Sequence, residues 1–122
     1  MGVGKNPSVF TITADKVTNE PCKKDGDLKA DSGKLRYDLL PIDALEGLAQ
    51  IFTYGSMKYE DYNWLKSEHP ERYYAAMMRH LAEVQRGNYI DPESKLLHID
   101  HALTCLVMYR ELLKKRGDFI QI

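Results

Sequence analysis

The stretch that decides the fold is residues 79–101, RHLAEVQRGNYIDPESKLLHIDH, which holds three of the chain's four histidines and four carboxylates. Gly87 can adopt the left-handed conformation that ends a helix, so the first part of this stretch predicts a helix C-terminus. Asp91 is expected to cap a following helix, with Pro92 at its first position. The stretch therefore predicts a helical hairpin rich in oxygen and imidazole ligands.

Working outward, the sequence predicts the remaining helix boundaries. Pro41 and Asp43 favour a helix start, and Gly55 is expected to end that helix. The second helix is expected from near His69 to Arg86, and the third from Pro92 to about Lys115. We therefore predict an all-α fold, a bundle of three main helices with a small extra turn near residues 60–70.

The first 30 residues contain most of the turn-forming residues and one strand-like run at residues 8–13. We predict a partly irregular N-terminal arm over residues 1–30 and one helical domain over residues 31–122.

Helical periodicity predicts which side chains are buried. The third helix carries two apolar stripes, so it is expected to pack between neighbours. Its first stripe is Ile99, Leu103, Leu106 and Tyr109, and its second is His98, His101, Cys105, Met108 and Leu112. The stripe of the first helix is Ile42, Leu45, Leu48, Ala49 and Phe52, and that of the second is Tyr73, Ala76, Met77, His80, Leu81 and Val84. A bundle of only three main helices would bury these stripes better as a homodimer or homotetramer.

The composition excludes several classes of protein. The net charge is −1, which argues against a dedicated binder of nucleic acid or of membrane surfaces. No apolar run reaches the roughly 18 residues that a membrane helix needs, and the N-terminus has no signal-peptide core. Cys22 and Cys105 lie in different settings and are not expected to pair. A cytoplasmic protein is the expectation.

The histidines predict a metal site more strongly together than singly. A single buried histidine is usually a hydrogen-bonded core residue, but His80 and Glu83, and His98 and His101, are each three residues apart and share a helix face. Helical bundles hold metals in their cores with such pairs. Magnesium or manganese suits a site where oxygens dominate, and zinc or iron suits one where imidazoles dominate.

Each remaining acid has a plain structural interpretation beside the functional one. Asp91 is expected as a helix cap, and Glu93 would complement the helix dipole. Glu46 is either a solvated flank residue or a side chain that reaches a site between helices.

Residues 54–64 contain four aromatic residues, including the single tryptophan. This segment is either a structural lid or a platform for a flat ring, with Asn63 beside the ring's edge and Lys58 at a phosphate. Lys34 and Arg36 are either loop cations or phosphate-binding residues.

These motifs together resemble a known family. They are GKLRYDLLP at residues 33–41, YGSMKY at 54–59, Asn63-Trp64, RHL at 79–81, DPES at 91–94 and HIDHA at 98–102. In order, they resemble the phage dATP/dGTP diphosphohydrolase (MazZ-like) family, a MazG-related group of all-α nucleoside triphosphate pyrophosphohydrolases. The resemblance covers about residues 30–113.

The resemblance implies an oligomeric helical enzyme that cleaves a purine deoxynucleoside triphosphate, a small-molecule substrate, to monophosphate and pyrophosphate. Mg²⁺ or Mn²⁺ would bridge phosphate oxygens and help to activate water. The broader group carries Glu-x-x-Glu and Glu-x-x-Asp, whereas the matching positions of this chain are His80-x-x-Glu83 and either His98-x-x-His101 or, one residue earlier, Leu97-x-x-Asp100.

On this reading, three sets of residues carry the activity. Catalysis falls to Glu46, Glu83 and Asp100. Metal binding falls to Glu46, His80, Glu83, Asp91, His98, Asp100 and His101, with Glu93 as an alternative helper. Substrate binding falls to Lys34, Arg36, Lys58, Asn63, Trp64 and Arg79.

Two other functions compete with this one. A non-catalytic module would use the same hairpin to bind a nucleotide or a partner without releasing pyrophosphate. A histidine-rich metal hydrolase of the HD phosphohydrolase type would release triphosphate or inorganic phosphate instead.

Overall fold

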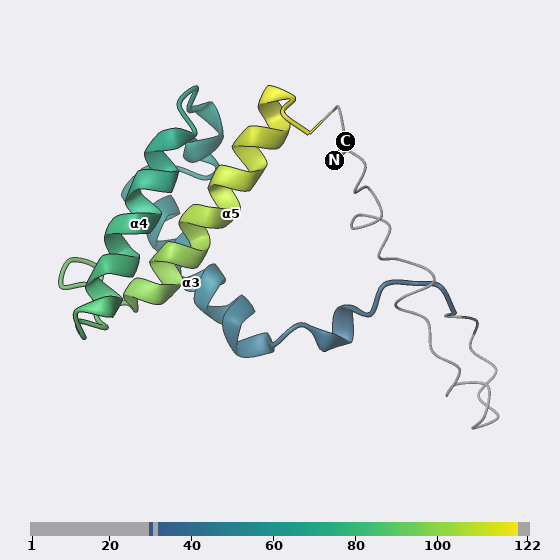
Figure 1. Cartoon of the computed structure of the whole chain (residues 1–122), viewed down its shortest axis with the longest axis horizontal. Helices are drawn as coiled ribbons and strands as arrows, with labels where there is room; N and C mark the ends of the chain where they lie inside the picture. The colour runs from purple at the N-terminus through teal and green to yellow at the C-terminus, as the bar shows by residue number, and fades with distance from the viewer. Residues whose placement is uncertain (1–29, 31, 120–122) are drawn as a thin grey trace. The chain divides into compact units, whose positions relative to one another are not determined.

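The computed structural model describes Ala30 and residues 32–119 of the 122-residue chain (Figure 1). These residues belong to two compact units, one containing residue 30 and residues 32–40, the other residues 41–119. The strand-like run at residues 8–13 lies outside the described residues, as does the rest of the expected arm before Ala30.

Among the described residues of the smaller unit, Tyr37–Leu39 form the short 3₁₀ helix η2. The guanidinium of Arg36 donates two hydrogen bonds to the carboxylate of Asp38, each 2.8 Å long, and so closes the turn at the start of η2. This pairing lowers the pKa of the Asp38 carboxyl. Lys34, just before this turn, is exposed.

The larger unit is helical, as predicted. Its elements are α3 (Ile42–Lys58), the 3₁₀ helix η3 (Asn63–Lys66), α4 (Glu71–Gln85) and α5 (His98–Arg116). Within the described part of the chain, pairing between extended segments is limited to one isolated bridge, between Ile90 and Leu97. Helix α5 is the central element, because it packs against α4, α3 and η3 (Figure 1). None of the helices described is long and apolar enough to cross a membrane.

The expected boundaries of α4 are confirmed. The helix begins at Glu71, directly after Pro70, and Gly87 follows its end with a φ of 89°. The N–H of Gly87 donates to the carbonyl of Val84, which satisfies one of the open carbonyls at the helix end. The end of α5 follows the same rule at Gly117, whose φ is 94°.

The expected end of α3 is wrong. The helix passes through Gly55 and ends at Lys58, and the N–H of Tyr59 still donates to the Gly55 carbonyl. A glycine inside a helix lowers its stability without breaking it, so Gly55 is an interior residue and not a terminator.

The expected start of α5 at Pro92 is also wrong, because the helix begins at His98. An oxygen of the Asp91 side chain accepts the N–H of Glu93 at 2.9 Å, as a cap would, but Lys95 then takes a left-handed φ of 66°. A residue in that conformation cannot continue a right-handed helix. Pro92 therefore lies in a turn that precedes the helix.

The buried face of α5 confirms one of the two predicted stripes. His98, His101, Cys105 and Leu112 are all buried. Ile99 and Leu106 on the other stripe are each 46% exposed.

The stripe predicted for α3 does not form the core of the single chain. Ile42 is 73% exposed, and the residues of α3 that are buried are Gly47 and Ile51. Gly47 is buried because α5 approaches it closely: a Cβ at this position would lie 2.6 Å from the carboxylate atoms of Asp100.

Candidate metal centre

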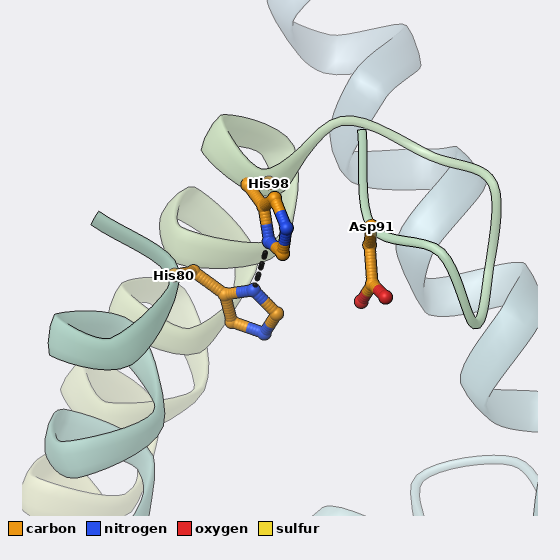
Figure 2. A group of neighbouring side chains, drawn as sticks. All are labelled: His80, Asp91 and His98. Atoms are coloured by element: carbon orange, nitrogen blue, oxygen red, sulfur yellow. Dashed lines mark hydrogen bonds between the residues drawn. The ribbon is translucent and has the colours of Figure 1, made fainter. Parts of the chain in front are cut away.

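Three side chains converge at one end of the α4–α5 pair. His80 comes from the last turns of α4, Asp91 from the loop that follows, and His98 is the first residue of α5 (Figure 2). One ligand atom from each lies within 4.8 Å of the other two. The Nδ1 atoms of His80 and His98 are 2.9 Å apart, so one ring donates a hydrogen bond to the other.

The loop from α4 to α5 holds Asp91 in place with its own backbone. The N–H of Asp91 donates to the Leu96 carbonyl at 2.8 Å, and the N–H of His98 donates to the Tyr89 carbonyl at 2.8 Å. These bonds close the loop across its base. The carboxylate of Asp91 is thereby presented beside the two histidines.

A third imidazole lies next to this group. The ring of His101 stacks on that of His80, with centroids 4.6 Å apart and 10° between the planes. Its Nε2 is 2.7 Å from the Ser94 hydroxyl and 3.4 Å from Asp91. Ser94 was not among the predicted site residues, although it belongs to the DPES motif at residues 91–94.

Burial controls the charge of two of these histidines. Removal from water is the main cause that lowers the pKa of His80 and of His101, and the neighbouring histidines lower both pKa values further. The two rings are therefore neutral at pH 7. Neutral imidazole is the form that binds a metal ion or accepts a proton.

The three-residue group could hold a metal ion. Two ligand atoms bonded at about 2.1 Å to one ion lie roughly 3.0 Å apart in octahedral and roughly 3.4 Å apart in tetrahedral geometry, so the two Nδ1 atoms at 2.9 Å would have to separate slightly to share an ion. Two imidazoles and a carboxylate are the donors expected for manganese, iron or zinc more than for magnesium.

The remaining predicted acids lie outside this group. Glu83 accepts hydrogen bonds from Asn88 at 2.8 Å and Arg86 at 2.9 Å. Asp100 lies against Gly47, and Glu46 on the same stretch of α3 is exposed. The metal-binding and catalytic roles of Glu46, Glu83 and Asp100 stay predictions.

The candidate metal centre opens into a pocket of about 1050 Å³. His80, Asp91 and His101 line one part of it. The other walls come from the C-terminal half of α3, the loop to η3, α4 and α5. Four predicted substrate-binding residues share this pocket with the histidines: Lys58, Asn63, Trp64 and Arg79.

One wall of this pocket is aromatic. The rings of Trp64 and Phe52 lie 5.8 Å apart and tilted, which anchors the tryptophan. The ring centroids of Tyr54 and His101 lie 6.2 Å apart with the planes at 89°, so Tyr54 connects the aromatic wall to the histidines. Trp64 packs on a neighbouring ring, as the lid interpretation expects, and it also lines the pocket, while its role as a platform for a flat ring stays a prediction.

A small polar network links the aromatic wall to the Asp91 loop. Glu93 accepts hydrogen bonds from Lys58 at 2.7 Å and from the Tyr54 hydroxyl at 3.2 Å. The bond to Glu93 is the main cause that raises the pKa of Lys58 to about 12, and the same bond lowers the pKa of Glu93. The sequence contained no signal for this contact, because it joins residues 35 positions apart.

Lys34 and Arg36 were predicted to bind phosphates. Both belong to the smaller unit, where Arg36 is paired with Asp38. Their role at the pocket stays a prediction.

Fold and site together define a helical protein with a histidine-rich candidate metal centre at the end of an aromatic pocket. The chain belongs to the family described as dATP/dGTP diphosphohydrolase, N-terminal, whose model matches residues 24–120. This confirms the family resemblance drawn from the motifs.

A curated relative is the dATP/dGTP diphosphohydrolase of Salmonella phage PMBT28, which is 33% identical over 89 residues. The match covers 73% of this chain and 30% of the relative, so the chain spans less than a third of that protein's length. No solved structure matches the chain.

Proposed function

We propose that this chain hydrolyses purine deoxynucleoside triphosphates, dATP or dGTP, to the monophosphate and pyrophosphate with the help of a divalent metal ion. The observation that carries the proposal is the His80–Asp91–His98 group, of which His80 and Asp91 line a pocket with an aromatic wall. Membership of the dATP/dGTP diphosphohydrolase family supports the same reaction and suggests the substrates.

His80, Asp91 and His98 would hold the metal ion, and we expect Mn²⁺ to serve better than Mg²⁺ because two of the three donors are imidazoles. A divalent ion there supplies Lewis acidity, which neutralises phosphate charge and makes a water molecule easier to deprotonate.

The residues around the ion have separate roles. His101 lines the pocket and is neutral at pH 7, so it is suited to take a proton from the attacking water. Lys58 and Arg79 would neutralise phosphate oxygens.

The nucleoside would occupy the aromatic side of the same pocket. Trp64 offers a flat face for stacking on a purine, and Asn63 offers an amide that can both donate to and accept from the base edge. Both residues line the pocket that contains the histidines.

Product analysis tests the proposal. Purified protein is incubated with each common ribo- and deoxyribonucleoside triphosphate, with Mn²⁺, Mg²⁺ or chelator, and products are separated by anion-exchange chromatography. We expect monophosphate and pyrophosphate from dATP or dGTP. Both products should disappear with chelator and with Asp91→Asn. If Asp91→Asn leaves turnover unchanged, Asp91 is not part of the active site. Turnover lost in Glu46→Gln, Glu83→Gln or Asp100→Asn, with unchanged circular dichroism, would support the roles predicted for those acids.

One observation favours a second candidate. The metal group contains two histidines and one aspartate, which resembles the donor set of a histidine-rich phosphohydrolase more than a set of four carboxylates. Such an enzyme would release triphosphate or inorganic phosphate from the same nucleotides. The chromatogram separates the two reactions directly.

A homodimer or homotetramer remains part of the proposal. The exposed apolar side chains of α3 and α5, among them Ile42, Ile99 and Leu106, support association. Light scattering after size-exclusion chromatography measures the assembled mass, and a monomer at micromolar concentration would contradict this part.

A further inference from the structure

A second pocket, of about 710 Å³, lies between η3 and the first turns of α4. It is lined by polar and charged side chains, including Lys66, His69, Arg72 and Arg79. The small side chains of Ala75 and Ala76 leave room between the two arginines. None of the roles predicted from the sequence involves Arg72.

The second pocket carries an excess of positive charge. Within residues 41–119, the guanidiniums of Arg72 and Arg79 form neither an ion pair nor a hydrogen bond. Lys66 is paired with Glu60 at 2.6 Å, and Glu68 adds one carboxylate to the pocket. Two unpaired guanidiniums on one concave surface favour a multivalent oxyanion, since the planar fork of arginine binds two phosphate oxygens at once.

The spacing of the two arginines lets them act on one ligand. Arg72 and Arg79 are seven residues apart on α4, two helical turns, so they lie on the same side of the helix about 10 Å apart at the backbone. Their long side chains can reach the space between them.

The second pocket adjoins the first. Asn63, Tyr73, Ala76 and Arg79 line both. Arg79 directly precedes His80 of the candidate metal centre, so it stands at the boundary between the histidines and the second pocket. A ligand with one phosphate at the histidines can extend further phosphates past Arg79 toward Arg72.

We propose that the second pocket binds the β- and γ-phosphates of the nucleotide and, after cleavage, inorganic pyrophosphate, with Arg72 as a substrate-binding residue. This inference rests on the proposed function. A water oxygen bonds to the α-phosphorus, the bond from that phosphorus to the bridging oxygen breaks, and the electron pair leaves on pyrophosphate. The water's proton goes to a base at the histidine end. Arg72 and Arg79 stabilise the charge that develops on the leaving group.

The proposal predicts a difference between the two products. Pyrophosphate binding should depend on Arg72, whereas binding of the monophosphate, which has no β- or γ-phosphate, should not. Arg72→Gln removes the charge, Arg72→Lys keeps it without the fork, and Arg110→Gln removes one exposed arginine charge on α5, away from both pockets.

Isothermal titration calorimetry with inorganic pyrophosphate and with dGMP, in chelator, measures this difference on the full chain. We expect Arg72→Gln to weaken pyrophosphate binding roughly tenfold or more, Arg72→Lys to restore part of it, and dGMP binding to stay unchanged in both. Arg110→Gln should bind pyrophosphate like the unaltered protein. Because Arg72 is exposed, circular dichroism should be the same for all variants.

Several outcomes would overturn all or part of the inference. If Arg72→Gln binds pyrophosphate as tightly as the unaltered protein, Arg72 is not part of the site. If Arg110→Gln loses as much affinity as Arg72→Gln, the loss comes from the overall charge of the protein and not from a specific contact. If dGTP is cleaved to monophosphate and pyrophosphate while Arg72→Gln still binds pyrophosphate normally, the proposed function stands and this inference fails. If pyrophosphate binding depends on Arg72 but no triphosphate is cleaved with any metal, the anion pocket stands and its assignment to a leaving group fails.

Discussion

The Nδ1 atoms of His80 and His98 lie 2.9 Å apart, although one residue belongs to α4 and the other begins α5. In the metal-free protein this contact is a hydrogen bond between two imidazoles. A divalent ion held by both nitrogens would need a free lone pair on each, so the proton between them would have to move to an Nε2 atom or leave. The contact therefore holds two candidate ligands, one on α4 and one at the start of α5, side by side.

Removing one of these candidate ligands should weaken metal binding strongly. We expect His98→Ala to lower the affinity for Mn²⁺ by more than the roughly 10- to 100-fold loss that is typical when a partner outside the ligand set is removed. Calorimetric titration with Mn²⁺ and Zn²⁺ measures the affinities. His69→Ala is the matched control, because His69 is exposed and absent from the metal group. Equal affinities in the two variants would exclude His98 as a ligand.

The metal-free protein should lose stability as the pH falls below about 6.5. The pKa values of His80 and His101 are lowered in the folded chain from the ordinary value of 6.5, so the unfolded chain binds more protons in this range. The free energy of unfolding is therefore highest above pH 6.5 and decreases as the pH drops through the folded pKa values.

Urea denaturation at pH 7.5, 6.5 and 5.5 measures this dependence. These pH values lie above the ordinary pKa values of carboxylates, so the histidines account for most of the change in stability between them. The double variant His80→Gln/His101→Gln should show a flatter profile. If the stability of this variant still depends steeply on pH, groups other than His80 and His101 take up the protons.

The contact between Gly47 and Asp100 should make two glycines of α3 behave in opposite ways. A Cβ on residue 47 would lie 2.6 Å from the Asp100 carboxylate, whereas a Cβ on Gly55 meets nothing within 4 Å. We expect Gly47→Ala to lower the free energy of unfolding by about 1–3 kcal/mol. Gly55→Ala should raise it by up to about 1 kcal/mol through helix propensity.

Chemical denaturation of both variants measures the two effects. Adding Asp100→Ala should remove most of the cost of Gly47→Ala, because the clash is with that side chain. If Gly47→Ala is as harmless as Gly55→Ala in the unaltered background, α3 and α5 are further apart than the structure shows.

Loss of the Lys58 charge should weaken nucleotide binding more than turnover. Lys58 stays charged far above pH 7, because its pKa is about 12, and it lines the pocket that contains the histidines. We expect Lys58→Met to raise the KM for dGTP about tenfold with a smaller change in kcat, as for loss of one hydrogen bond to a charged group. Steady-state kinetics measure both constants. Lys114→Met, which changes an exposed lysine at the end of α5, should leave them unaltered, and a similar KM in both variants would contradict the role of Lys58.

The single tryptophan provides a direct measure of base binding. Trp64 lines the pocket and contacts Phe52, so a purine stacked on it should change its fluorescence. We expect dGMP to quench the emission and inorganic pyrophosphate to leave it largely unchanged. Trp64→Ala should weaken nucleotide binding about tenfold or more, measured by calorimetry, since base–aromatic stacking contributes about 1–3 kcal/mol. Unchanged emission with dGMP would place the base elsewhere.

The sequence alone determined the helical class, the bounds of α4 and the inward direction of the histidines on α5. These features depend on local rules: the 3.6-residue period, the glycine that follows a helix, and the proline before one. It also determined the family, through motifs in a fixed order. Local rules failed at Gly55, which a helix tolerates in its interior, and at Pro92, where the left-handed Lys95 delays α5 until His98.

Only the tertiary structure decided which side chains meet. Periodicity places His80 beside Glu83 on one helix, yet Glu83 turns to Asn88 and Arg86, while His80 meets His98 and Asp91. The reason is physical: a helical repeat relates neighbours on one helix, whereas a metal site joins atoms from separate segments. The separation of those atoms depends on how α4 packs against α5 and on how the loop between them closes.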